Sequence, residues 1–245
     1  MPRAVCWPAI AMLMALAPVA AALANDMDMN DAARFGQIVV DQWELRDNGA
    51  ARNGVWEAEG WYGGDYDKLV VRSEGDWPSG APAQGRVELL WDRIATRWWS
   101  VQAGARYDAG DGPGKGWAAV GVRGLAPYWI DIEATLYLGS AGSVAGRLKA
   151  QTDLRVTQRL VLQPELELNG YSRADRARQQ DAGLADIDAG LRLRYEIRRD
   201  FSPYLGLAWV RLAGERAVDG AGDGAGQSAG AAEQLQWLIG VRFWF

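Results

Sequence analysis

Apolar and polar residues alternate over most of this chain, in segments of about ten residues separated by turn-like stretches. In RVELLWDR, Val87, Leu89 and Trp91 share one face, while charged residues occupy the other. The same two-residue period runs to the C-terminus, where QLQWLIGVRFWF ends on Phe245. A period of two is typical of β-strands that have one face against an apolar environment. The pattern therefore predicts an all-β fold.

Twelve such segments are present, and we predict that each forms one strand. The first has mixed faces and carries the weakest signal. Their predicted bounds are 36–46, 54–63, 67–75, 85–95, 98–108, 116–124, 128–138, 144–156, 159–171, 184–198, 203–212 and 234–245. The connections alternate between short turns and longer polar loops such as AGERAVDGAGDGAGQSAGAA. This rhythm is typical of outer-membrane barrels, which have short periplasmic turns and long outer loops.

The period alone does not decide which face of the strands looks inward. A soluble β-sandwich or lipocalin-type barrel buries its apolar faces, whereas a membrane barrel turns them to lipid. An export signal, the loop rhythm and the apolar last strand favour the membrane, because an unpaired apolar edge aggregates in water. We therefore predict a transmembrane antiparallel β-barrel of about 12 strands over residues 36–245, closed by pairing of the last strand with the first.

The N-terminus has the features of a secretory signal peptide. Arg3 precedes a long apolar stretch, and ALA at 22–24 is an A-x-A cleavage site. We predict a cleaved signal peptide at 1–24, followed by a short disordered segment at 25–35; a retained membrane helix is the alternative. Cleavage would remove Cys6, the only cysteine, so the mature chain would have no thiol chemistry.

Composition excludes several functions. The signal segment contains one charged residue, Arg3, so 25 of the 26 basic residues and all 31 acidic residues remain, a net charge of −6. This acidic balance argues against nucleic-acid binding. The chain contains no histidine, which removes the usual base of Ser–His hydrolases and the commonest ligand of catalytic zinc. We therefore expect no enzymatic activity.

Several segments resemble the copper-resistance protein B family. EAEGWYGGDYDKL and GLAPYWIDIEATLY are the most specific, and the resemblance extends over nearly all of residues 36–245. It implies a Gram-negative outer-membrane barrel that acts in copper homeostasis, with a periplasmic multicopper oxidase or copper-binding protein as partner. The terminal Phe245 resembles the C-terminal signal that the barrel-assembly machinery reads.

The chain departs from that family near its N-terminus, where a long stretch rich in Met and His is reduced to NDMDMND. Copper(I) prefers soft sulfur ligands, so Met27 and Met29, beside Asp26 and Asp28, are the candidate copper ligands. Two thioethers form an incomplete site. The alternative is a disordered remnant of a longer segment.

The inward faces of the predicted strands carry charges of both signs. Glu165, Asp186 and Asp188 lie near the outer mouth on two neighbouring strands, and we predict that they form a cation-attracting vestibule. Lys149 is expected opposite Glu167. Deeper in the lumen the vestibule's second strand is expected to carry Arg192, Arg194 and Arg198. The alternative is a static ion-pair lattice that uses arginines from across the lumen. Two functions remain: a barrel that handles or passes copper, or a structural or small-solute barrel without a metal role.

Overall fold

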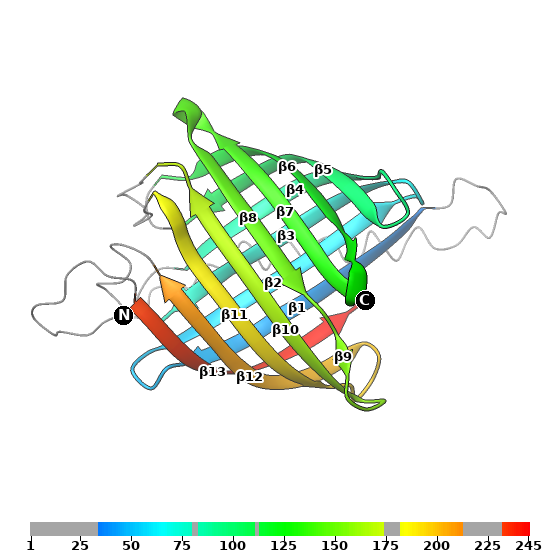
Figure 1. The fold of residues 1–245 in the computed structure, drawn as a ribbon, viewed down its shortest axis with the longest axis vertical. Coiled ribbons are helices and arrows are strands. Elements are labelled where there is room, and N and C mark those ends of the chain that lie inside the picture. Colours follow the sequence, from blue (N-terminus) through cyan, green and yellow to red (C-terminus); the bar gives the residue numbers. More distant parts are fainter. Residues whose placement is uncertain (1–33, 80–82, 111–112, 174–181, 213–231) are drawn as a thin grey trace, which may run out of the picture.

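The chain forms a closed antiparallel barrel whose strands are strongly tilted around a common axis (Figure 1). The computed structural model describes residues 34–79, 83–110, 113–173, 182–212 and 232–245. The predicted signal peptide at 1–24 and most of the segment 25–35 lie outside these residues. In the described part of the chain, no helix is long and apolar enough to cross a membrane.

Each strand pairs with the next along the sequence, except that β8 pairs with β10 instead of with the short β9, and the last strand pairs with the first. The strands are β1 (Phe35–Asp47), β2 (Arg52–Gly63), β3 (Asp67–Pro78), β4 (Gln84–Ile94), β5 (Trp99–Ala109), β6 (Lys115–Ala126), β7 (Ile130–Gly139), β8 (Val144–Gln151), β9 (Leu154–Arg155), β10 (Leu160–Tyr171), β11 (Gly183–Tyr195), β12 (Phe201–Leu212) and β13 (Ala232–Trp244). Two single 3-10 turns, η1 (Pro127–Trp129) and η2 (Ser140–Gly142), flank β7.

β8 and β9 form one interrupted barrel strand, because both pair with β10. The barrel therefore has 12 strands around its circumference, as predicted, although the segment 144–156 was expected to be continuous. The interruption lies opposite Pro164, which has no N–H group to donate across the pair. Its carbonyl oxygen still accepts a hydrogen bond from the backbone N–H of Thr152, at 3.2 Å.

The two ends of the chain close the barrel. Val39 is paired with Trp244, and the backbone N–H of Phe245 donates to the carbonyl of Ile38 at 2.8 Å. The reciprocal bond, from the N–H of Ile38 to the carbonyl of Phe245, is 3.2 Å long. The apolar last strand thus has no open edge, which confirms the predicted closure.

A β-bulge in β1 explains why this segment has mixed faces in the sequence. The register with β2 skips Asp41 between Val40 and Gln42, and the register with β13 also shifts there. A bulge adds one residue, so the inward positions change from odd to even numbers. Beyond the bulge Glu44 is buried while Leu45 is 54% exposed.

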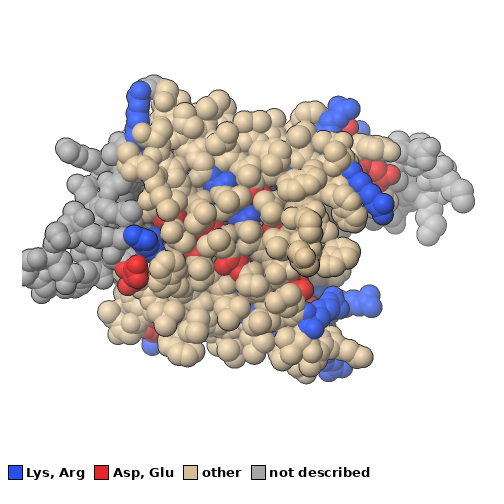
Figure 2. Space-filling view, in the orientation of Figure 1, with Lys and Arg blue, Asp and Glu red and all other residues tan. Residues whose placement is uncertain are grey.

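Burial in this barrel is the reverse of that in a water-soluble protein. Leu89 and Ile239 are 51% and 65% exposed, whereas Glu88 and Arg192 are 0% and 1% exposed. The wall in Figure 2 is largely uncharged, with most of the visible lysines and arginines at its two ends. Alternation with inward charged residues places a set of apolar side chains on the lipid face, and all of them are exposed or half-buried: Val87, Leu89, Trp91, Ile130, Ile132, Leu166, Leu168, Leu191, Leu193, Ile239 and Val241. A soluble sandwich or lipocalin would have the opposite arrangement.

The two ends of the barrel differ in their connections. We call one the turn end, with connections 64–66, 95–98, 127–129, 156–159 and 196–200, and the other the loop end, with 48–51, 79–83, 110–114, 140–143, 172–182 and 213–231. The expectation for Arg198 was wrong. β11 ends at Tyr195, so Arg198 lies exposed in a connection at the turn end instead of deep in the lumen.

Candidate functional site

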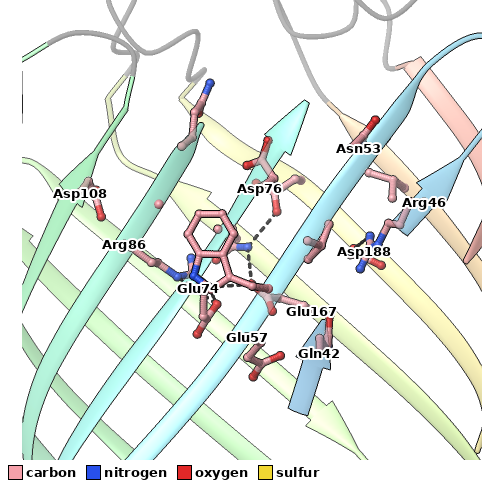
Figure 3. Close-up of a pocket in the computed structure, with 18 of the residues that line it drawn as sticks. Gln42, Arg46, Asn53, Glu57, Glu74, Asp76, Arg86, Asp108, Glu167 and Asp188 are labelled. Atoms are coloured by element: carbon pink, nitrogen blue, oxygen red, sulfur yellow. Dashed lines mark hydrogen bonds and ion pairs between the residues drawn. The ribbon is translucent and has the colours of Figure 1, made fainter. Parts of the chain in front are cut away.

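A cavity of about 440 Å³ lies inside the loop-end half of the barrel, and we call it the cup (Figure 3). Its walls come from β1 to β5 and from β10 to β13. Among the described residues, eight carboxylates and three arginines line it: Glu57, Glu74, Asp76, Asp108, Glu165, Glu167, Asp186 and Asp188, with Arg46, Arg86 and Arg106. A cavity lined mainly by one sign of charge raises the local concentration of ions of the opposite sign. The cup is therefore suited to cations.

Ion pairs form a lattice of two networks at and below the floor of the cup. Both are defined here by contacts of 3.6 Å or less between described residues. The first network is a chain of alternating charge, in the order Asp188, Arg46, Glu44, Arg192, Glu165, Lys149, Glu57. Arg192 on β11 reaches Glu44 on β1 at 3.0 Å, three strands away around the barrel wall. Lys149 on β8 reaches Glu57 on β2, on the far side of the lumen.

The second network is branched and also crosses the lumen. Its members are Glu59, Glu74, Glu88, Glu133 and Glu167 with Arg72, Arg86, Arg123 and Arg147. Arg147 on β8 contacts Glu74 on β3 at 3.0 Å, and Arg72 on β3 contacts Glu133 on β7 at 2.6 Å. The branches of this network meet at Arg147. Besides Glu74, Arg147 contacts Glu133 at 3.0 Å and Glu167 at 2.9 Å.

Below the cup, the ion-paired side chains of the lattice fill the lumen. Arg147, Arg72 and Glu88 are 3%, 2% and 0% exposed although all three point into the barrel. Buried charges are stable only where their hydrogen-bonding groups are satisfied. Two buried hydroxyl groups help: Tyr137 donates to Glu88 at 2.6 Å and Tyr204 to Glu44 at 3.0 Å. The described side chains therefore close the lumen below the cup, without an inserted domain.

The structure brings the three predicted vestibule residues together in the wall of the cup. Glu165 is the most deeply embedded, with Arg192 at 3.3 Å and the amide nitrogen of Gln42 donating at 3.0 Å. Asp188 is paired with Arg46, and Asp186 accepts a hydrogen bond from Asn169 at 2.8 Å. The vestibule residues thus lie together as predicted, and they also take part in or adjoin the ion-pair lattice that was the alternative prediction. Attraction of cations to these residues remains a prediction.

Lys149 occupies the predicted register position opposite Glu167, but its ammonium group contacts Glu57 and Glu165 instead. Glu167 pairs with Arg147 and with Arg86. Neighbours along a strand pair were thus predictable, whereas contacts across the lumen were not.

Glu57 and Glu74 were not singled out from the sequence. They are directly opposite one another on β2 and β3, and both line the cup. Counting outward from the turn at 64–66 would have found them, since a hairpin turn sets the register of its two strands.

The residues available for metal binding are restricted to oxygen ligands. No Met, His or Cys occurs in residues 34–245. In the described ranges, no three Asp or Glu side chains are grouped so that they could hold a metal ion. The predicted copper ligands Met27, Met29, Asp26 and Asp28 lie outside the described residues, so a copper(I) site there remains a prediction.

Comparisons with known proteins agree with this architecture. The closed barrel is similar in fold to the NanC porin, with a TM-score of 0.54 and 12% identity, covering 84% of this chain and 98% of that one. The copper resistance protein B homolog of Pseudomonas syringae pv. tomato is 39% identical over 217 residues, which are 89% of this chain and 72% of the relative. Copper resistance protein B of Escherichia coli is 37% identical over the same shares. The family model of the copper resistance protein B precursor matches residues 34–245. The chain therefore belongs to the copper resistance protein B family.

Proposed function

We propose that this chain handles copper ions at the outer membrane of a Gram-negative cell, as a barrel without enzymatic activity. Membership of the copper resistance protein B family supports the link to copper. The exposed apolar wall and the closed barrel support the outer membrane. In this orientation the loop end faces outward, and the predicted signal peptide and barrel-assembly machinery bring the chain there.

The single observation that carries the proposal is the acidic cup. Among the described residues its eight carboxylates outnumber its three arginines, and it lies at the loop end, where ions from outside would arrive. Glu165, Asp186 and Asp188 belong to this wall, as the vestibule hypothesis requires. We infer that the cup concentrates cations, copper(II) among them, above the closed lattice.

The ligands present restrict which copper ion each part of the chain can hold. Carboxylate oxygens are hard ligands and suit copper(II) far better than copper(I). A copper(I) ion would need the thioethers of Met27 and Met29, assisted by Asp26 and Asp28. We propose that these residues act on the periplasmic side, where a multicopper oxidase or copper-binding protein would accept the ion.

A second function, a structural or small-solute barrel without a metal role, is favoured by one observation: the lumen is filled by ion pairs between described residues. The two functions differ in whether the carboxylates of the cup affect copper tolerance. Passage of any ion through the barrel would require the lattice to rearrange.

Copper tolerance of a complemented deletion strain tests the proposal. The wild-type chain should restore growth on copper, and the triple variant Glu165→Gln, Asp186→Asn, Asp188→Asn should restore it less well at equal outer-membrane yield. Glu233→Gln is the matched control, because Glu233 lies outside the cup lining and its side chain is 57% exposed. Full tolerance with the triple variant would favour the structural barrel, as would a wild-type chain that restores nothing.

A further inference from the structure

The ion-pair lattice carries more negative than positive charge. Among the described residues the first network has four carboxylates and three cations, and the second has five carboxylates and four arginines. Each network therefore has one carboxylate in excess. Uncompensated charge inside a barrel is costly because little water surrounds it. Something of positive charge is expected to balance the two excess carboxylates.

The two networks approach each other at Glu57 and Glu74. Glu57 is the end of the first network, and Glu74 belongs to the second. They are register partners across β2 and β3, and directly opposite residues have Cβ atoms about 4.5–5.5 Å apart. Like charges in such a pair repel. Figure 3 shows both side chains low in the cup, with Gln42 beside Glu57.

Oxygen atoms suited to a cation are present at this point. Glu74 is 9% exposed, and its Oε2 accepts from Arg86 and Arg147. Its other oxygen, Oε1, is buried and has no hydrogen-bond partner among the described residues. Gln42 is the register partner of Glu57 on β1, and its amide nitrogen donates to Glu165, which leaves its carbonyl oxygen as an acceptor. Three adjacent strands therefore offer oxygen ligands at one level of the cup.

We propose that Glu57 and Glu74 bind one hydrated divalent cation at the floor of the cup. Its two positive charges would balance the two excess carboxylates. Small divalent ions such as Mg²⁺ keep several waters and bind through one or two carboxylates, so a site with two carboxylates is sufficient. The cup, at about 440 Å³, has room for such an ion and its waters, since a water molecule takes about 30 Å³. The existence of this site does not depend on the proposed function. Only the identification of copper as its natural ion rests on that function.

Binding of Mn²⁺ to the full-length mature barrel in lipid nanodiscs tests this site, with free Mn²⁺ measured by electron paramagnetic resonance. The wild type should show one saturable site that Mg²⁺ competes for. Glu57→Gln and Glu74→Gln should each weaken binding at least about tenfold, and the double variant should not bind. Glu233→Gln, at the exposed rim, should bind like the wild type.

Wild-type protein that binds no Mn²⁺, or a double variant that binds as tightly as the wild type, would overturn the proposal. Heat-modifiable migration on a gel confirms that each variant is folded. If Glu74→Gln does not fold, Glu57→Gln alone decides, because Lys149 keeps its contact with Glu165 in that variant. Intact Mn²⁺ binding in a chain that fails to restore copper tolerance would reject the copper function and leave the site standing. Restored tolerance without Mn²⁺ binding would reject only the site.

Discussion

Replacing Arg147 by methionine should destabilise the barrel more than any change at its surface. Its guanidinium group contacts Glu74 and Glu133 at 3.0 Å and Glu167 at 2.9 Å, and its side chain is 1% exposed. At an effective dielectric constant of about 20, each contact is worth about 5 kcal/mol of Coulomb attraction. The cost of burying the arginine offsets part of this. The variant leaves five carboxylates facing three arginines in the second network.

Removing one partner of a buried ion pair typically costs about 3–5 kcal/mol, and the loss of three contacts places Arg147→Met near the upper end, about 5 kcal/mol. Urea titration of the barrel in lipid vesicles, followed by tryptophan fluorescence, measures this free energy of unfolding. Arg155→Met is the matched control, because Arg155 on β9 is exposed, and it should cost less than about 1 kcal/mol.

Adding Glu133→Gln to Arg147→Met should recover part of the loss, because it removes one of the three stranded carboxylates. The coupling energy of the two changes then reports their interaction directly. A cost below about 1 kcal/mol for Arg147→Met would equal that of breaking an exposed ion pair. Such a low cost would show that water fills the lumen and that the lattice does not close it.

Three further predictions concern the wall and the two ends of the chain. Leu191→Arg should cost about 2–4 kcal/mol in the same urea titration if Leu191, 44% exposed on β11, lies near the bilayer midplane; an unchanged midpoint would contradict its lipid-facing position. Deleting Phe245 should reduce outer-membrane assembly more than folded stability, because its backbone bonds to Ile38 close only the last rung. Normal yield and normal heat-modifiable migration would contradict this. Replacing both Met27 and Met29 by leucine should lower copper tolerance without changing barrel yield, and unchanged tolerance would exclude a copper role for these thioethers.

Much of the wall could be predicted from the sequence because a two-residue period maps directly onto two faces. Leu191 and Arg192 alternate in the chain and lie on opposite sides of the barrel, one 44% and the other 1% exposed. Local chemistry accounts for the departures. The bulge at Asp41 interrupts the alternation of β1, and Pro164 removes the N–H group that would have kept β8 continuous.

The candidate site was less predictable, because its contacts span the lumen. The register of Lys149 with Glu167 follows from a hairpin, but its contact with Glu57 depends on how the tilted strands of a closed barrel face each other. Alternation places charges of both signs in the lumen without saying which carboxylate meets which arginine. The number of carboxylates at the floor of the cup depends on how side chains pack across the lumen, and the alternation does not specify this packing.

Ionic current through the wild-type barrel tests most directly whether ion pairs close the lumen below the acidic cup. Single barrels would be inserted into planar lipid bilayers in potassium chloride, and the current recorded at constant voltage. We expect no sustained current above that of the bare bilayer, because buried Arg147, Arg72 and Arg192 and their carboxylates occupy the lumen. A steady current proportional to voltage from the wild-type barrel would show instead that the lumen is open.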